Sequence, residues 1–538
     1  MKVEEPSNEY SREALLAALM KPQSYSHEVG GIERIDTHIS TVLLTGPYAY
    51  KIKKPLNLGF LDFTTLASRR HFCEEELRLN RRLAPDLYLD VVAICGKPDS
   101  PRLCSRQTEG AIEYAVKMKQ FPQHSLLDRM LANGELTRQH VAALARTIAN
   151  LHAAANRAVK GDRYGTPASV EIQMWQNFVQ IRALLAHAED CGELDELERW
   201  SINEHADLIP LMAQRQSNGQ VRECHGDLHL GNIALVDGEI QVFDCIEFNA
   251  NLRWTDVAAE IAFLVMDFAA RGHPDLGACF LNAYLEITGD YEAARLLPYY
   301  LVYRAMVRAK VACIRSHQAD LMASQREASG ADFTAHLHLA GKFTEKRKPC
   351  LIITCGFSGS GKTTVTRPLV EHLGALCLRS DLERKRLHGL DGMARSGSAV
   401  GGGLYAEATT QATYNELHRL ARQLIESGWP LIVDAAFLKM SQRDRFRSLA
   451  AETNVPFLLL DCQADPEELR RRVVRRSATG ADASEATLAV LELQLNTGEA
   501  LSADERQQAI SVNTQYDDDK SIIGKLPSRL KGRVIPFQ

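Results

Sequence analysis

The sequence predicts a protein of two domains: an α+β domain with two lobes, followed by an α/β domain with a parallel sheet. Its 538 residues exceed what one hydrophobic core normally organises. Strand patterns dominate the first hundred or so residues, and helical periodicity follows from Arg138. Beyond residue 349 strands alternate with helices, which implies a parallel sheet. We therefore expect domains at 1–342 and 350–515, a linker at 343–349 and a C-terminal tail at 516–538.

The composition is that of a globular protein without an overall positive charge. Hydrophobic residues make up 45% and charged residues 24% of the chain, and the net charge is −5, so we expect no nucleic-acid partner. The N-terminus lacks the apolar core of a signal peptide, and no apolar stretch is long enough to span a bilayer. The 12 cysteines contain no Cys-x-x-Cys pair. This pattern favours buried thiols in a reducing cytoplasm over a zinc ribbon or a disulfide framework.

The first lobe is predicted to be strands with one helix. Ser40–Gly46 and Tyr48–Lys53 alternate around a Gly-Pro pair, which indicates a hairpin. Thr65–Leu83 is rich in Arg, Glu and Leu and predicts a helix that ends before Pro85. Tyr88–Cys95 and Ala111–Met118 predict a further antiparallel pair around a polar loop of Gly, Pro and Ser residues.

The second lobe is predicted to be helical around one short two-strand segment. Apolar positions with the helical period follow Arg138, namely Val141, Leu144, Ala145, Ile148, Leu151 and His152. Helical patterns continue to about Met212 and resume from Asp256 to about Gly341. The two-strand segment between them contains the first of two chemical motifs.

That motif is His225-Gly-Asp-Leu-His-Leu-Gly-Asn232, followed by a strand that ends at Asp244. Phosphoryl transfer needs an oriented hydroxyl, metal ions on the nucleotide phosphates and cations that disperse charge. Asp227 can accept the proton of the hydroxyl. Asn232 and Asp244 can offer oxygen atoms to Mg²⁺. The competing interpretation is that both aspartates only cap turns.

The motif His225-Gly-Asp-x-His-x-x-Asn resembles the catalytic loop of the aminoglycoside phosphotransferase and choline kinase group, which is related to the protein kinases. The resemblance covers roughly residues 30–320 and implies a protein-kinase-like bilobal fold with ATP and Mg²⁺ as its cofactors. It also implies that His225 braces the loop. The role of His229 stays open.

The resemblance further implies a lysine on the third strand, which holds the α/β-phosphates of ATP, and a glutamate on the following helix. Lys51 and Lys53 lie on one face of their strand, and we favour Lys51. For the glutamate, the helix offers Glu74, Glu75 and Glu76, of which we choose Glu76. The alternatives are solvent-exposed lysines and a solvent-exposed run of charge.

Two features depart from the family pattern. No glycine-rich loop precedes the lysine strand, where Asp36-Thr-His-Ile-Ser40 stands instead. Asp244 is followed by Cys-Ile-Glu247 and not by Phe-Gly. A further aspartate, Asp256, stands at a helix start and is expected to cap it.

The second motif, Gly356-x4-Gly-Lys-Thr363, follows the apolar strand Cys350–Cys355 and precedes a helix, which is the setting of a phosphate-binding P-loop. Lys362 should reach the β/γ-phosphates, and the Thr363 hydroxyl should ligate Mg²⁺. Backbone N–H groups and the helix N-terminus favour the phosphates. The predicted nucleotide-binding residues of this loop are Gly356, Ser358, Gly359, Ser360, Gly361, Lys362, Thr363 and Thr364.

The rest of this domain resembles small P-loop kinases such as gluconate kinase, chloramphenicol phosphotransferase and the polynucleotide 5′-kinases, over about 348–515. Asp381 and Arg384 form the Asp-x-x-Arg of their acceptor segment, which implies a base and an acceptor contact. Asp434 ends an apolar strand and is expected to bind Mg²⁺, either directly or through a water molecule of the metal. Arg472 and Arg476 lie on one helical face before a lid-like loop at 478–486 and are expected to stabilise the transferring charge.

Each of these assignments has a plainer alternative. Asp381 could only cap a helix, and the arginines could form a solvated face. No guanine-reading Asn-Lys-x-Asp motif is evident, which favours ATP. We therefore expect an enzyme with two Mg-ATP sites that moves phosphoryl groups to small-molecule hydroxyls. The alternatives are that one domain is a nucleotide-binding regulator of the other, or that the second is a polynucleotide 5′-kinase. The acceptors and the oligomeric state stay open.

Overall fold

The structure, a computed structural model, describes residues 7–57, 59, 61–159, 161–185, 192–318, 321–392, 394–396, 402–479 and 484–531. The chain divides into two compact units. The first comprises Met1–His140, Asn150–Ser169 and Leu211–Glu260, and the second Val141–Ala149, Val170–Pro210 and Ile261–Gln538. These units do not follow the boundaries expected from the sequence, which stay a prediction.

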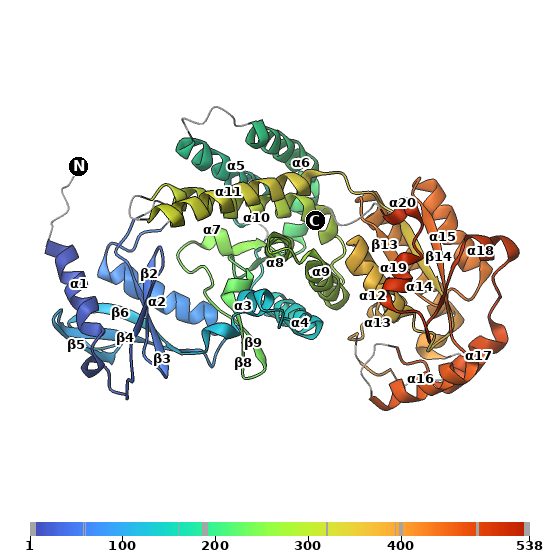
Figure 1. The fold of residues 1–538 in the computed structure, drawn as a ribbon, viewed down its shortest axis with the longest axis horizontal. Coiled ribbons are helices and arrows are strands. Elements are labelled where there is room, and N and C mark those ends of the chain that lie inside the picture. Colours follow the sequence, from blue (N-terminus) through green and yellow to red (C-terminus); the bar gives the residue numbers. More distant parts are fainter. Residues whose placement is uncertain are drawn as a thin grey trace. The chain divides into compact units, whose positions relative to one another are not determined.

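The first unit begins with a six-stranded antiparallel sheet in the order β1-β2-β3-β6-β4-β5 (Figure 1). Its strands and flanking helices are α1 (Ser7–Leu19), β1 (Glu33–Asp36), β2 (Ser40–Leu44), β3 (Tyr48–Lys53), α2 (Leu66–Asn80), β4 (Tyr88–Lys97), β5 (Ser100–Ser105) and β6 (Ala111–Lys119). Thr65 caps α2 by accepting a hydrogen bond from the Ser68 amide.

The side chains of β3 alternate between two different environments. Tyr50 and Ile52 pack with Leu15, Leu16 and neighbouring apolar residues of α1. The lysines at the intervening positions point to the opposite face, where α2 lies. The period of two along β3 therefore brings both candidate lysines to the helix that carries the candidate glutamates.

Two elements of this lobe differ from the sequence-based expectation. The helix α1 has no counterpart among the expected elements, because only a few apolar positions mark it. The polar loop expected after Cys95 contains the strand β5, which extends the sheet beyond β4. Pro101 and the polar residues around it fit an edge strand, because one side of such a strand stays unpaired.

Helices dominate the chain from Leu127 to Thr344, as the periodicity predicts. The elements are α3 (Leu127–Ala132), α4 (Arg138–Ala154), α5 (Pro167–Leu184), α6 (Gly192–Ser217), β7 (Val221–Glu223), β8 (Ile233–Val236), β9 (Glu239–Val242), α7 (Ala250–Arg253), β10 (Trp254–Asp256), α8 (Val257–Ala270), α9 (Pro274–Thr288), α10 (Ala293–Ser316) and α11 (Ala323–Thr344). The hairpin β8–β9 separates Asn232 from Asp244 and returns the chain to the loop after β7.

Asp256 has the structural role expected of it. Its carboxylate accepts a hydrogen bond from the Ala258 amide at 2.8 Å and two from Arg215, each at 2.9 Å. It thereby caps the start of α8.

The second unit contains a five-stranded parallel sheet in the order β12-β13-β11-β14-β15. Its elements are β11 (Leu351–Cys355), α12 (Lys362–Leu373), β12 (Leu376–Arg379), α13 (Ser380–Leu387), α14 (Glu407–Glu426), β13 (Leu431–Asp434), α15 (Met440–Glu452), β14 (Phe457–Gln463), α16 (Pro466–Thr479), α17 (Leu488–Thr497), α18 (Ala503–Gln508), β15 (Ile510–Asn513), α19 (Asp519–Gly524) and α20 (Ser528–Lys531). The order places the P-loop strand β11 in the centre, and the α/β fold class is as predicted.

The core of this sheet includes residues from outside the expected domain. Ile522, Leu526 and Leu530, from the expected tail, pack with the strands and α12. Ala278 of α9 belongs to the same apolar cluster. The side chain of Asn282, also on α9, donates to the Ala375 carbonyl at 3.0 Å and accepts from the Cys377 amide at 2.7 Å. It thus satisfies backbone groups on the open edge of β12.

Of the Gly/Ser-rich segment Ser396–Gly403, residues 397–401 lie outside the described residues, as do 480–483 of the lid-like loop. Among the helices that are described, none combines the length and apolar character required to cross a membrane. The eleven described cysteines are all free thiols, and nine of them are buried.

Candidate active sites

The first candidate centre is built around Lys51 of β3. Its Nζ donates to Glu76 Oε1 at 2.8 Å and to the carboxylate of Asp244. Burial alone would lower the pKa of Lys51, but these two carboxylates outweigh it and hold the pKa well above its usual range. The lysine, the helix glutamate and the aspartate after β9 therefore meet at one point.

Glu76 joins both candidate lysines. Its Oε2 accepts from Lys53 Nζ at 2.7 Å, and its side chain is fully buried. Burial would raise the pKa of Glu76, but the two ammonium groups outweigh it and lower the pKa to about 2. The other two glutamates of the run turn elsewhere: Glu74 pairs with Arg70, and Glu75 pairs with Arg78 and Arg253.

The predicted base and amide face each other in the loop after β7. Asn232 Nδ2 donates to the Asp227 carbonyl at 3.0 Å, and its contact with Asp227 Oδ2 is 3.4 Å. The ring of His225 contacts the Phe243 carbonyl at 2.8 Å and accepts from the Asp227 amide at 3.3 Å, so it braces the loop. His229, left open by the sequence, accepts from the Gly231 amide at 3.1 Å, and its Nε2 lies 3.5 Å from Asp227 Oδ2.

Asp244 leaves strand β9 with a φ of 65°, in the left-handed region that aspartate tolerates better than most residues. Its amide donates to the Tyr88 hydroxyl at 3.2 Å, and its side chain is 46% exposed. The carboxylate therefore has both a cationic partner and an open side. Oxygen atoms of Asp244 and Asn232 form the kind of donor set that suits Mg²⁺.

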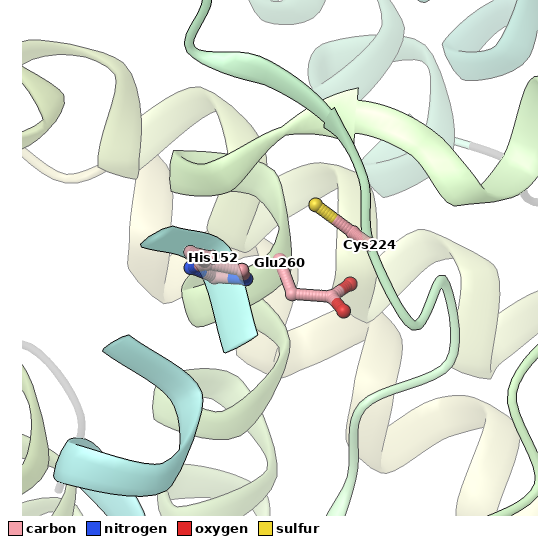
Figure 2. A group of neighbouring side chains, drawn as sticks. All are labelled: His152, Cys224 and Glu260. Carbon is pink, nitrogen blue, oxygen red and sulfur yellow. The ribbon is translucent and has the colours of Figure 1, made fainter. Parts of the chain in front are cut away.

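A buried group of possible metal ligands lies behind this loop. His152, Cys224 and Glu260 come from α4, the segment after β7, and α8, and their ligand atoms lie within 4.8 Å of one another (Figure 2). The Glu260 carboxylate already accepts hydrogen bonds from the amides of His225 at 2.6 Å and Gly226 at 3.1 Å. It thereby fixes the backbone that positions Asp227.

The other two members of this group are poorly suited to hold a cation. Burial, with the nearby guanidinium groups of Arg222 and Arg82, lowers the pKa of His152 to about 3, and the same two positive charges would repel a metal ion. Burial also raises the pKa of the Cys224 thiol far above its usual range, and a metal would require its thiolate. We interpret the group as packing that supports the loop.

The second candidate centre follows β11. At two positions of its P-loop, the surrounding atoms leave no room for a side chain, so glycine is required. A Cβ on Gly356 would lie 2.5 Å from Ser360 Oγ and 2.6 Å from the Cys462 carbonyl oxygen. A Cβ on Gly359 would lie 2.9 Å from the Leu469 carbonyl oxygen. Both glycines also have positive φ values, so other residues would strain the loop.

The charged residues of the P-loop have partners that fit a nucleotide site. Lys362 Nζ donates to the carbonyls of Gly356 at 3.0 Å and Phe357 at 2.9 Å, so it lies along the loop. The Thr363 hydroxyl donates to Asp434 Oδ2 at 2.6 Å, which joins the end of β13 to the start of α12. Burial raises the pKa of Asp434 against the opposing charges of Arg379 and Lys362.

A cavity of about 630 Å³ adjoins this loop and contains most of the predicted residues of the second centre. Asp381 and Arg384 of α13 line it, with Arg384 Nη1 4.0 Å from Asp381 Oδ1. Burial would raise the pKa of Asp381, but Arg384, a hydrogen bond from Ser484 and the nearby Arg379 outweigh it and lower the pKa. Eleven predicted residues line the cavity: Ser358, Gly359, Gly361, Lys362, Thr363, Thr364, Asp381, Arg384, Asp434, Arg472 and Arg476.

The two arginines of α16 have different hydrogen-bond partners. Arg472 donates to the Gly359 carbonyl at 3.3 Å and to the Thr514 hydroxyl at 2.8 Å. Arg476 donates to the Ala486 carbonyl at 3.2 Å, on the far side of the lid-like loop. Of the other predicted residues, Gly356 and Ser360 shape the loop without lining the cavity.

The cavity residues that sequence reasoning missed include four with polar side chains: Arg379, Tyr414, Lys439 and Gln442. Arg379 ends β12 and lies between Asp434, at 4.0 Å, and Glu286 of α9, at 3.5 Å. Its place at the carboxyl end of a parallel strand was a usable signal. The other three come from α14 and the start of α15, where helical sequence provides no comparable signal.

Two parts of the chain match known families. Residues 65–297 match the phosphotransferase enzyme family, and residues 351–501 match a family described as AAA domain. Among curated relatives, the uncharacterized protein Rv2004c of Mycobacterium tuberculosis and the uncharacterized protein Mb2027c of Mycobacterium bovis are each 31% identical over 484 residues. Each match covers 88% of this chain and 93% of the relative.

Solved structures resemble one part or the other. A choline/ethanolamine kinase family protein from Mesorhizobium loti is 12% identical, with a TM-score of 0.38, over 61% of this chain and 98% of that one. A gluconokinase from Sinorhizobium meliloti is 20% identical, with a TM-score of 0.24, over 33% of this chain and 90% of that one. With the mycobacterial relatives and both family matches, the chain belongs to a family that joins a phosphotransferase enzyme domain to a kinase-like P-loop domain.

Proposed function

We propose that each centre transfers the γ-phosphoryl group of ATP, with Mg²⁺, to a hydroxyl group of a small molecule. The observation that most supports this is the meeting of Lys51 with Glu76 and Asp244 in one centre. In the other, Lys362, Asp381 and Asp434 line one cavity. Each centre thus has a cation for phosphate, a carboxylate for a proton and oxygen ligands for a metal. A cytoplasmic location stays a prediction of the sequence.

In the first centre, Lys51 neutralises the phosphates and Glu76 orients its ammonium group. Asp227 accepts the proton of the acceptor hydroxyl, and Asn232 with Asp244 would hold Mg²⁺. Bound Mg²⁺ would disperse the charge that develops on the phosphates. For Lys51 to reach phosphate, its contact with Asp244 must be exchanged, which leaves that carboxylate to the metal.

In the second centre, Lys362 turns from the loop carbonyls to the β/γ-phosphates, and Thr363 with Asp434 would hold Mg²⁺ or its water. Asp381 stays ionised through Arg384 and can take the proton of the acceptor. Arg472 and Arg476 approach the transferring group from α16. Every charged residue that the motifs of this domain indicate thereby has a role.

The experiment is a metabolite-library screen with radiolabelled ATP, run on the intact chain and on two variants. Asp227→Ala should abolish transfer by the first centre only, and Asp381→Ala transfer by the second only. If Asp227→Ala leaves all transfer intact, the first centre is not a kinase centre, and a regulatory role for its nucleotide becomes the better account. The same logic applies to Asp381→Ala.

A further inference from the structure

Lys53 and Glu247 are charged residues of the first centre that the proposed reaction does not use. Lys53 Nζ donates to Glu76 Oε2 at 2.7 Å and to the carboxylate of Glu247, and it lies 5.0 Å from the centroid of the Phe63 ring. The side chains of Lys53 and Glu247 are 0% and 3% exposed. Two charges buried this deeply stabilise each other, because either one alone would be an uncompensated buried charge.

These two residues extend the catalytic contacts into a continuous row of alternating charge. The row runs from Asp244 through Lys51, Glu76 and Lys53 to Glu247, and each ammonium group bridges two carboxylates. Three carboxylates and two ammonium groups leave one negative charge in excess. The exposed member of the row is Asp244, at 46%, so its carboxylate is the one in the row that a cation can reach.

Both ends of the row belong to one four-residue segment, Asp244-Cys-Ile-Glu247. The segment therefore meets β3 twice, at Lys51 and at Lys53. Its backbone is also held, since the Cys245 amide donates to Asn80 Oδ1 at 3.0 Å and the Ile246 amide donates to the His225 carbonyl at 3.0 Å. Arg253 donates to the Glu247 carbonyl at 3.1 Å.

We propose that Lys53 and Glu247 are positioning residues that hold the Asp244 carboxylate in place for the metal before nucleotide binds. This inference rests on the proposed function of the first centre. When Lys51 moves from Asp244 to phosphate, Lys53 still holds Glu76 and Glu247, so neither α2 nor the segment after β9 loses its anchor. The metal site is then assembled in advance, and binding does not have to order it. The second lysine and the replacement of Phe-Gly by Cys-Ile-Glu thus serve the same role, which is to hold the Asp244 carboxylate in place.

The test measures metal and nucleotide separately, in the full chain with Lys362→Ala to silence the P-loop centre. Glu247→Asp keeps the charge but shortens its reach, and the double variant Lys53→Met/Glu247→Gln removes both charges together. In each, the Mg²⁺ concentration that half-saturates nucleotide binding should rise by about tenfold or more, as for other groups that orient metal ligands. Binding of metal-free ATP in EDTA should change little, because it depends on Lys51. A purely structural role would alter both measurements or neither.

A second measurement does not require nucleotide. Hydrogen exchange at the Cys245 and Ile246 amides should accelerate in both variants. The matched control is Lys54→Met, at the residue directly after β3, whose Nζ donates to the Thr37 carbonyl at 2.6 Å. It should change neither exchange nor metal dependence.

The two measurements separate the possible failures. If the parent protein binds no nucleotide at this centre, the proposed function fails. Hydrogen exchange at the Cys245 and Ile246 amides then tests by itself whether Lys53 and Glu247 hold the segment in place. Folded variants with parental Mg²⁺ dependence and parental exchange would overturn the inference.

Discussion

The Thr363 hydroxyl donates a 2.6 Å hydrogen bond to Asp434, so the start of α12 and the end of β13 share one candidate metal site. Thr363→Val keeps the shape of the side chain but removes the hydroxyl. We expect it to lower ATP turnover by the second centre about tenfold or more, with a raised Mg²⁺ requirement. Steady-state kinetics across a Mg²⁺ series checks this. Thr366→Val, on the same helix, should leave the Mg²⁺ requirement unchanged.

Glu76 is expected to be the most costly single charge to remove from the first unit. Glu76→Gln leaves the buried ammonium groups of Lys51 and Lys53 undercompensated, and such losses cost about 3–5 kcal/mol. Glu74→Gln, two residues away on the exposed side of α2, should cost under about 0.5 kcal/mol. Urea unfolding followed by a probe in the first unit measures both. Equal losses would contradict the central place of Glu76.

His152 should make the protein sensitive to acid. Its pKa is about 3 in the folded protein, below the ordinary value of 6.5, so the unfolded chain binds the proton more readily. The stability contributed by neutral His152 is fully present above pH 6.5 and is lost progressively as pH falls toward 3. His152→Phe should therefore lose less thermal stability than the parent between pH 7.5 and pH 5. The exposed His71→Phe serves as control and should follow the parent.

Arg472 and Arg471 are neighbours on α16 with different expected effects. Arg472 contacts the P-loop backbone, whereas Arg471 is 77% exposed and pairs with Glu468. Arg472→Ala should reduce turnover by the second centre about 10²-fold, in line with other groups that stabilise transferring charge. Arg471→Ala should leave turnover near the parental rate. A similar rate in both variants would remove Arg472 from the proposed mechanism.

Nucleic acid is not expected to be the acceptor of the second centre. A polynucleotide 5′-kinase would bind single-stranded oligonucleotides with an affinity that falls steeply with salt. We expect weak binding with a flat salt response, measured by fluorescence anisotropy between low and physiological salt. A steep response that disappears in Arg475→Ala, at the cavity, would instead support the polynucleotide alternative.

The sequence predicted the local elements that have strong periodic or motif signals. Strand β3 and the α2 N-terminus at Thr65 were anticipated within a residue, and the P-loop was expected in its strand–loop–helix setting. Strand β5 was missed because its few polar residues look like a turn. Strand β15 was not predicted, because its four residues are too few to show a clear alternation of apolar and polar positions.

The candidate sites show the same division. Spacing along the chain singled out Asp227, Asn232 and Asp244, because one loop and one hairpin hold them. It favoured Lys51 but could not exclude Lys53, since a strand places both on one face. It also missed Arg379, although that residue ends a strand, and it could not predict the pairing with Glu286, which lies far away in the sequence.

By itself, the sequence determined the two chemical motifs, the fold class and the residue types available to each centre. Only the tertiary structure decided which charges meet. Lys51 faces the exposed Asp244, whereas Lys53 is enclosed with Glu247, although the two lysines have identical chemistry and equivalent positions on β3. The reason is physical: burial and the distance between opposite charges depend on how α2 and the segment after β9 pack against the sheet, and neither is written in local spacing.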